Sequence, residues 1–250
     1  HNDMLVLTFV FLSLYFAASK KLFWVLPAFG LSLCVKHTSI LLALPLLIWL
    51  YQQHKAMISR LFLSLLVTIL EMAILYGLYW EGLKIFDSLI FWQQRRSAAS
   101  LHYFLTHFFE APDSVSQGLI AIFLIAYVWV AVSLSVRSKS NDAGFTDLTK
   151  ACSVILLFFY CFGLKWWQSW YVSWAIPFVL FLDPKDPSVR LVIAMSFFSL
   201  LGFGLFLMRG YTIDFQYGFF LFSFVVPMLS LLVFKRLYPK SAWNTIVPPA

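Results

Sequence analysis

The residues best suited to chemistry are a few charged side chains set in long apolar stretches. Asp3 follows His1 and Asn2 at the start of an apolar run, and Lys36 with His37 interrupts another. A carboxylate placed like Asp3 either caps a helix or faces a cavity, where it could bind a sugar hydroxyl or a metal or act as a base. A lysine within an apolar run either extends to the membrane surface or holds a phosphate. The sequence leaves both pairs of alternatives open.

A dense aromatic segment, KWWQSWYVSWAIPF, occupies residues 165–178. Trp and Tyr at the end of a span usually anchor it at the membrane interface. This segment has more rings than anchoring needs, and aromatic faces beside hydrogen-bonding groups suit a sugar ring or a lipid–phosphate junction. The predicted substrate-binding residues here are Lys165, Gln168, Trp170, Tyr171 and Trp174. Arg209, further along the chain, either contacts lipid head groups or binds a phosphate of the substrate.

The composition decides which class of protein positions these residues. The chain has 250 residues, of which 62% are hydrophobic and only 12% are charged, against about 25% charged in ordinary soluble proteins. So few charges cannot cover a soluble protein of this size, and the apolar residues form continuous blocks, unlike the alternating pattern of an outer-membrane barrel. The sequence therefore predicts an all-α, polytopic transmembrane bundle with a single domain over residues 1–250.

Nine apolar segments are predicted as spans, several of them short or broken. They are Asp3–Ala18, Leu22–Val35, Thr38–Tyr51, Leu61–Trp80, Gly118–Val136, Ala151–Leu164, Trp170–Leu182, Val189–Met208 and Phe215–Phe234. A regular span needs about 20 apolar residues, so the short segments favour helices that line a cavity. The segment 81–117 is predicted to lie outside, with an interfacial helix within Asp87–Glu110.

The basic residues set the expected orientation. With the His1 end outside, twelve of the 18 Lys and Arg residues fall in inner loops, as the positive-inside rule requires. The formal net charge of +7 is thereby explained by topology and does not indicate a nucleic-acid partner. The predicted substrate-binding residues all lie at the outer end. We therefore expect a multi-pass integral membrane protein, in contact with membrane lipid, whose active face is extracytoplasmic.

Three segments together resemble the GT-C superfamily of membrane glycosyltransferases, which use polyprenyl-phosphate sugars. The first, His1-Asn2-Asp3 opening an apolar helix, is similar to prokaryotic polyprenol-phosphate-mannose-dependent mannosyltransferases. The second runs from Gly30 to Pro45 around Lys36-His37, a pair also similar to dolichyl-phosphate-glucose glucosyltransferases. The third is Trp170-Tyr171-Val-Ser-Trp174-Ala-Ile-Pro177. Order and spacing agree over most of the chain.

The resemblance implies a hexosyltransferase that works by inverting transfer. A hexose, mannose or glucose, would pass from a polyprenyl-phosphate donor to a lipid-linked or cell-envelope acceptor, a glycan or glycolipid, on the extracytoplasmic side. Lys36, helped by His37 and Arg209, would stabilise the departing phosphate, and Trp170, Tyr171 and Trp174 would flank the sugar or the first isoprene units.

The same resemblance places an acidic residue, acting as base or metal-linked carboxylate, in an outer loop after the first span. No such loop precedes His1. We therefore expect this acid to lie upstream of His1, in a longer protein whose N-terminal part is not included here. Asp3 is then a secondary candidate for catalysis and a better one for substrate binding, for which His1 and Asn2 are also predicted. A divalent metal is the one cofactor left open.

Three rival interpretations remain. O-antigen polymerases and ligases also act on lipid-linked sugars from outside, but they carry a large outer loop with arginines, whereas residues 81–117 are modest in length and mostly apolar. Transporters usually show inverted repeats, and none is evident. A purely structural membrane subunit is the third alternative.

Overall fold

The computed structural model describes residues 2–78, 80, 82, 100–138, 144–165, 169–209, 218 and 220–237. All regular structure within these ranges is helical, which confirms the all-α prediction. Helices long and apolar enough to cross a membrane cover Lys55–Leu78, Asp113–Arg137, Phe145–Gly163 and Pro187–Leu205, and shorter apolar helices cover Asn2–Ala18, Leu22–Val35 and Leu221–Leu231. The helices support a membrane protein, while the number of nine spans stays a prediction.

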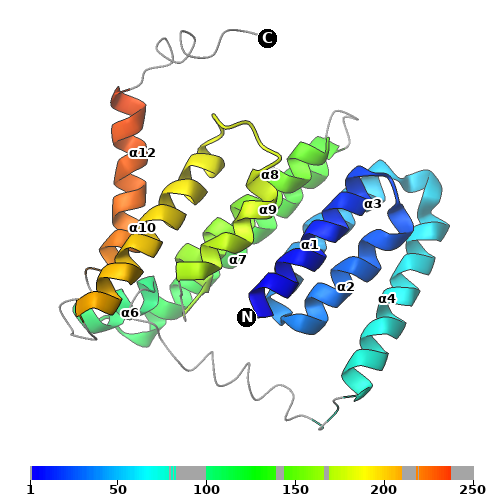
Figure 1. Ribbon diagram of the computed structural model, residues 1–250, viewed down its shortest axis with the longest axis horizontal. Helices are drawn as coiled ribbons and strands as arrows, with labels where there is room; N and C mark the ends of the chain where they lie inside the picture. The colour runs from blue at the N-terminus through cyan, green and yellow to red at the C-terminus, as the bar shows by residue number, and fades with distance from the viewer. Residues whose placement is uncertain are drawn as a thin grey trace.

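The N-terminal half is a row of antiparallel helices (Figure 1). It comprises α1 (Asn2–Ala18), η1 (Leu22–Trp24), α2 (Val25–Val35), η2 (His37–Leu42), α3 (Ala43–Gln53), η3 (Lys55–Met57) and α4 (Ile58–Leu78). Helix α1 packs along α2, and α2 packs against α4. Because consecutive helices reverse direction, the start of α1 and the end of α2 lie at one end of the bundle. We call this the Asp3 end, and the opposite end the Lys20 end.

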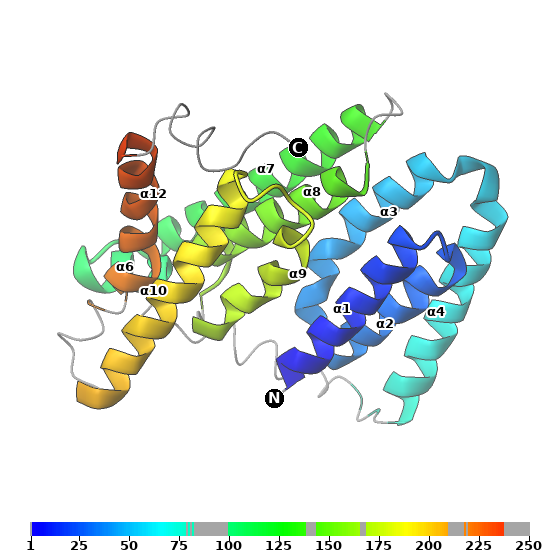
Figure 2. The same cartoon turned by 45° about the horizontal axis from the view of Figure 1, so that its top comes forward.

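The C-terminal half packs against α1 and α3. It comprises α6 (Leu101–Phe108), α7 (Asp113–Ser138), α8 (Phe145–Phe158), η5 (Phe159–Gly163), η6 (Ser169–Ala175), α9 (Ile176–Val179), α10 (Pro187–Arg209), η7 (Leu221–Val225) and α12 (Val226–Leu237). Helix α7 contacts α3 and α8, and α9 contacts α1, as Figure 2 lets the reader follow. Here η5 and η7 are π-helical, while η6 is a 3₁₀-helix.

Apolar side chains between the two halves form the main core. Phe29, Leu50, Leu148, Leu156 and Phe178 are all buried there. In contrast, α4 and α7 expose long rows of large apolar side chains. A bilayer provides the apolar surroundings that such surfaces need, and close packing of side chains then holds the helices together.

Helix α6 is the described helix of the predicted interfacial segment, and His102 fixes it to the bundle. The His102 side chain is fully buried, with Nδ1 2.6 Å from Ser116 Oγ and Nε2 2.8 Å from the Phe162 carbonyl oxygen. A carbonyl only accepts, so Nε2 carries the proton and Nδ1 accepts from Ser116. His102 therefore joins α6 to α7 and η5. Residues 83–99 lie outside the described ranges, so the full interfacial helix stays a prediction.

Candidate functional site

A lysine-centred cluster occupies the Asp3 end of the bundle. Lys36 Nζ donates a hydrogen bond to Asp3 Oδ1 at 2.7 Å. The same ammonium lies 4.7 Å from the ring centroid of Tyr171 and 4.5 Å from that of Trp174. Both distances are within the range of cation–π attraction. The structure thus brings together one residue from the first segment of the resemblance, one from the second and two from the third.

A break in the backbone places Lys36 at the centre of this cluster. Lys36 is the extended residue (φ −158°, ψ 122°) between α2 and η2. Its N–H donates to the Ser32 carbonyl at 3.0 Å, and its carbonyl accepts from the Ser39 hydroxyl at 2.9 Å. Asp3 lies in the first turn of α1, where the positive end of the helix favours a carboxylate. The antiparallel packing of α1 on α2 then brings the two charges together.

The 3₁₀ geometry of η6 places the two aromatic rings on one face. Residues three apart lie above one another in a 3₁₀-helix. Tyr171 and Trp174 accordingly pack together, with ring centroids 4.8 Å apart at 41°. The predicted span 170–182 is therefore not a continuous α-helix. It consists of η6 followed by α9, in whose first turn Pro177 is accommodated.

The two charged side chains of the cluster differ in how deeply they are buried. The Lys36 side chain keeps 30% of its surface exposed, whereas that of Asp3 keeps only 8%. The hydroxyl of Tyr160, a fully buried residue of η5, lies within electrostatic range of Asp3, as does Tyr171. An ammonium has several N–H donors. The exposed part of Lys36 can therefore bind an anion while one N–H stays on Asp3.

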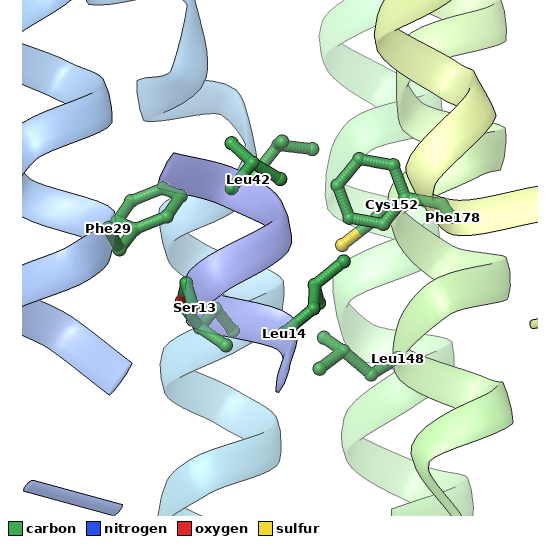
Figure 3. A pocket seen from close by; sticks show the side chains of 9 residues that line it. Ser13, Leu14, Phe29, Leu42, Leu148, Cys152 and Phe178 are labelled. Atoms are coloured by element: carbon green, nitrogen blue, oxygen red, sulfur yellow. The ribbon is translucent and has the colours of Figure 1, made fainter. Parts of the chain in front are cut away.

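Two small cavities lie along α1, between it and the helices that face it: an upper one nearer the Asp3 end, which adjoins the cluster through Trp174, and a lower one further along α1. The upper cavity is lined by Val6, Leu7, Val10, Thr38, Ser39, Leu42, Leu156, Trp174 and Phe178. The lower cavity shares Val10, Leu42 and Phe178 with it and extends to Ser13, Leu14, Phe29, Leu46, Leu148 and Cys152. Figure 3 shows the lower cavity, with Phe29 on one side, Leu148 and Cys152 on the other, and α1 between them.

The other predicted site residues are not part of the observed cluster. Asn2 begins α1 and is exposed. His37 is directed to α4 instead, with Nε2 3.1 Å from Tyr76 Oη and its ring stacked on that of Tyr76. Lys165 follows η5 at the same end. His1 and Gln168, together with the side chains of Trp170 and Arg209, lie outside what the structure describes.

Several polar residues around the cluster were not predicted from the sequence. Thr38 and Tyr160 stand in apolar runs, and Tyr76 stands near the end of a long span. Within an apolar run, the side on which a hydroxyl lies depends on the helix type. Thr38 lies in the 3₁₀-helix η2 and Tyr160 in the π-helix η5, so α-helical periodicity does not predict the sides on which their hydroxyls lie.

A second ion pair, at the Lys20 end, has a structural explanation. Lys150 Nζ lies 2.6 Å from Asp186 Oδ2, and the Ser188 N–H donates to Asp186 Oδ1 at 2.9 Å, which caps α10. Partial burial opposes ionisation of Asp186, but the hydrogen bonds from Lys150 and Ser188 outweigh it and lower the pKa of this carboxyl. Lys150 keeps 44% of its side chain exposed, and no aromatic face contacts it in the part of the chain that is described. This pair therefore serves as a comparison for Lys36.

Within the described ranges, no group of three or more His, Cys, Asp or Glu side chains is placed to hold a metal ion.

Comparison with known proteins gives no match: the chain fits no family model, no curated protein and no solved structure.

Proposed function

We propose that this protein is a multi-pass membrane glycosyltransferase of the GT-C type, which moves a hexose, mannose or glucose, from a polyprenyl-phosphate donor to a lipid-linked or cell-envelope acceptor. The observation that carries the proposal is the contact of Lys36 with Asp3, Tyr171 and Trp174. Three segments far apart in the sequence supply a cation, a carboxylate and two aromatic faces to one partly open point. A phosphate and the sugar attached to it need these groups together.

Each residue of the cluster has a role in the proposed transfer. An acceptor oxygen attacks the anomeric carbon, the bond from that carbon to the phosphate oxygen breaks, and its electron pair passes to the polyprenyl phosphate. Lys36 stabilises the negative charge that develops on this leaving group. Tyr171 and Trp174 present their rings to the sugar or to the first isoprene units.

The acceptor proton would pass to the catalytic carboxylate that the resemblance implies, which is not part of the observed cluster. Asp3 already accepts a hydrogen bond from Lys36 through Oδ1. Asp3 is therefore better suited to orienting the ammonium than to taking the proton.

The orientation of the chain belongs to the same proposal. The Asp3 end faces the extracytoplasmic side, and the Lys20 end, with most of the basic residues, faces the cytoplasm. Sugar lipids that have been flipped across the membrane then meet Lys36 from outside.

The test is binding and transfer of a radiolabelled hexose by the protein reconstituted in nanodiscs. The probes are polyprenyl-phosphate mannose and polyprenyl-phosphate glucose. Removing a charge-assisted contact to phosphate costs about 1.5–3 kcal/mol, so Lys36→Met should weaken donor binding by about tenfold to a hundredfold. Lys150→Met is the matched control, because Lys150 is the other lysine with an observed ion pair, and it should leave donor binding unchanged.

The rival functions give other results. If Lys36→Met abolishes movement of a lipid or solute across the membrane without affecting sugar transfer, the protein is a transporter. If wild-type protein binds neither donor and Lys36→Met alters only stability, the cluster is structural and the proposal is wrong.

A further inference from the structure

Two polar atoms that lack hydrogen-bond partners among the described residues belong to side chains that line the upper cavity, beside the lysine-centred cluster. They are Trp174 Nε1 and Thr38 Oγ1, and both atoms are buried. Only 6% of the surface of Trp174 is exposed, so bulk water does not satisfy its N–H. Buried polar groups in folded proteins nearly always have partners. The cavity between them is therefore the place to look for the missing partner.

The lower cavity provides the contrast. Its polar lining residue Ser13 already donates to the Val25 carbonyl at 2.9 Å. Its remaining lining is Cys152 and hydrocarbon side chains, seen in Figure 3. A cavity of this kind stays dry. The upper cavity, with a donor in Trp174 and a hydroxyl in Thr38, has the polarity that a bound oxygen needs.

The size of the upper cavity limits its occupant. It has room for about one water molecule, and the surrounding walls are largely apolar. An indole N–H only donates, while a threonine hydroxyl both donates and accepts. A hydroxyl oxygen satisfies both atoms, because it accepts from one and donates to the other. An ionised phosphate or carboxylate oxygen could accept from both atoms, but it would bring a negative charge among largely apolar walls, which is costly.

We propose that the upper cavity is a subsite for one hydroxyl oxygen, which accepts a hydrogen bond from Trp174 Nε1–H and donates one to Thr38 Oγ1. In the free protein this oxygen belongs to water. With a donor lipid bound, it belongs to a hydroxyl of the sugar, and this second source rests on the proposed function. Trp174 then contacts the ammonium of Lys36 with its ring and recognises the sugar with its N–H, while Thr38 becomes a specificity-determining residue.

The first experiment needs no ligand. A cryo-EM map of the whole protein in nanodiscs, bound to an antibody fragment and sharp enough to show ordered water, should contain a peak within about 2.7–3.2 Å of both atoms. An empty cavity in such a map would overturn the subsite. This result stands whether or not the protein is a glycosyltransferase.

The second experiment separates the two sources of the oxygen. The affinities of polyprenyl-phosphate mannose and of bare polyprenyl phosphate are measured for wild type, Thr38→Val and Thr38→Ser. Valine keeps the shape of threonine and removes the hydroxyl, whereas serine keeps the hydroxyl. Loss of one hydrogen bond is worth about three- to tenfold in affinity. Thr38→Val should therefore lower the affinity for polyprenyl-phosphate mannose by that factor and leave the affinity for bare polyprenyl phosphate unchanged. Thr38→Ser should bind both lipids as wild type does.

Other outcomes decide against part of the proposal. If Thr38→Val changes neither affinity while the density peak is present, the oxygen is water alone. If both affinities fall equally, Thr38 acts through the position of Lys36, and recognition of a sugar hydroxyl is refuted. If wild-type protein binds neither lipid, the proposed function fails, and the density peak alone decides the subsite.

Discussion

Replacing Lys36 by methionine distinguishes a phosphate-binding lysine from a structural one. The substitution keeps an unbranched apolar chain and removes the ammonium that contacts Asp3, Tyr171 and Trp174. The Asp3 carboxylate, with its side chain only 8% exposed, then stays buried without the ammonium of Lys36. Breaking a buried pair costs about 3–5 kcal/mol. Because Lys36 itself is 30% exposed, we expect the lower end of this range, about 3 kcal/mol, including the loss of the ring contacts.

The double variant Lys36→Met with Asp3→Asn separates the effect on stability from the effect on donor binding. With both charges removed, no uncompensated ion remains in the site. Neutral replacements of buried ion pairs often match the wild type in stability. The free energy of unfolding of the double variant should therefore be within about 1 kcal/mol of the wild-type value. Its affinity for polyprenyl-phosphate mannose should remain about tenfold to a hundredfold below that of wild type.

Two assays on the same preparations measure these quantities. Denaturant unfolding in mixed micelles, followed by tryptophan fluorescence, gives the free energy of unfolding. Binding of the labelled lipid in nanodiscs gives the affinity. Recovery of both stability and binding in the double variant would show that Lys36 has only a structural role, in which its ion pair with Asp3 holds the end of α2 against α1. Wild-type stability in the single variant would refute the reasoning about the buried Asp3 carboxylate.

Three further predictions concern the scaffold, each measured by the same unfolding assay. Gly30→Ala places a Cβ 2.5 Å from an α4 side chain and should lower the free energy of unfolding by about 1–3 kcal/mol. In Gly77→Ala the added Cβ meets nothing within 4 Å, so this control should stabilise α4 slightly. Equal effects of the two variants would contradict the close approach of α2 and α4. His102→Ala leaves two partners unsatisfied in a buried site and should cost about 2–4 kcal/mol; a cost near zero would show that α6 is held otherwise. The lowered pKa of Asp186 stabilises the fold above the ordinary carboxyl pKa of about 3.9 and is lost as the pH falls through the folded-state pKa. The advantage of wild type over Asp186→Asn, about 0.5–1 kcal/mol at neutral pH because Lys150 is partly exposed, should therefore begin to fall below about pH 4 and vanish below the folded-state pKa of Asp186. An advantage that does not decrease below about pH 4 would exclude the ion pair as its source.

The positions of the helices along the chain could be predicted from the apolar blocks, but not all of their ends: α7 begins at Asp113 rather than Gly118, and α8 at Phe145 rather than Ala151. Each predicted span that the structure describes contains helix, and Asp3–Ala18 differs from α1 by a single residue at its start. Alternating direction then places Asp3, Lys36 and the aromatic segment at one end. Hydropathy and chain reversal determine this much, because a span must be apolar and a short loop returns the chain to the opposite end. They do not determine which side chains touch.

The contacts within the site depend on helix type, which the sequence pattern did not reveal. In an α-helix, residues three apart are offset by about 60° around the axis, whereas in a 3₁₀-helix they coincide. Tyr171 and Trp174 therefore face Lys36 together, and the prediction could not separate them from the other aromatic residues of the segment. For the same reason the prediction placed His37 beside the phosphate site, whereas η2 directs it to Tyr76.

The break between the short helices α2 and η2 explains how the ammonium of Lys36 comes to face the interior of the bundle. A break at membrane depth is tolerated only where protein groups satisfy the freed backbone atoms. At Lys36 the Ser32 carbonyl and the Ser39 side chain and N–H do so. The extended residue can then turn an ammonium toward the interior of the bundle, which a lysine on a continuous lipid-facing helix could not do without exposing its charge to hydrocarbon. The irregular stretches between Lys36 and Leu42 and between Ser169 and Ala175 are therefore the means by which a mostly apolar chain brings a cation, a carboxylate and two rings together at one point.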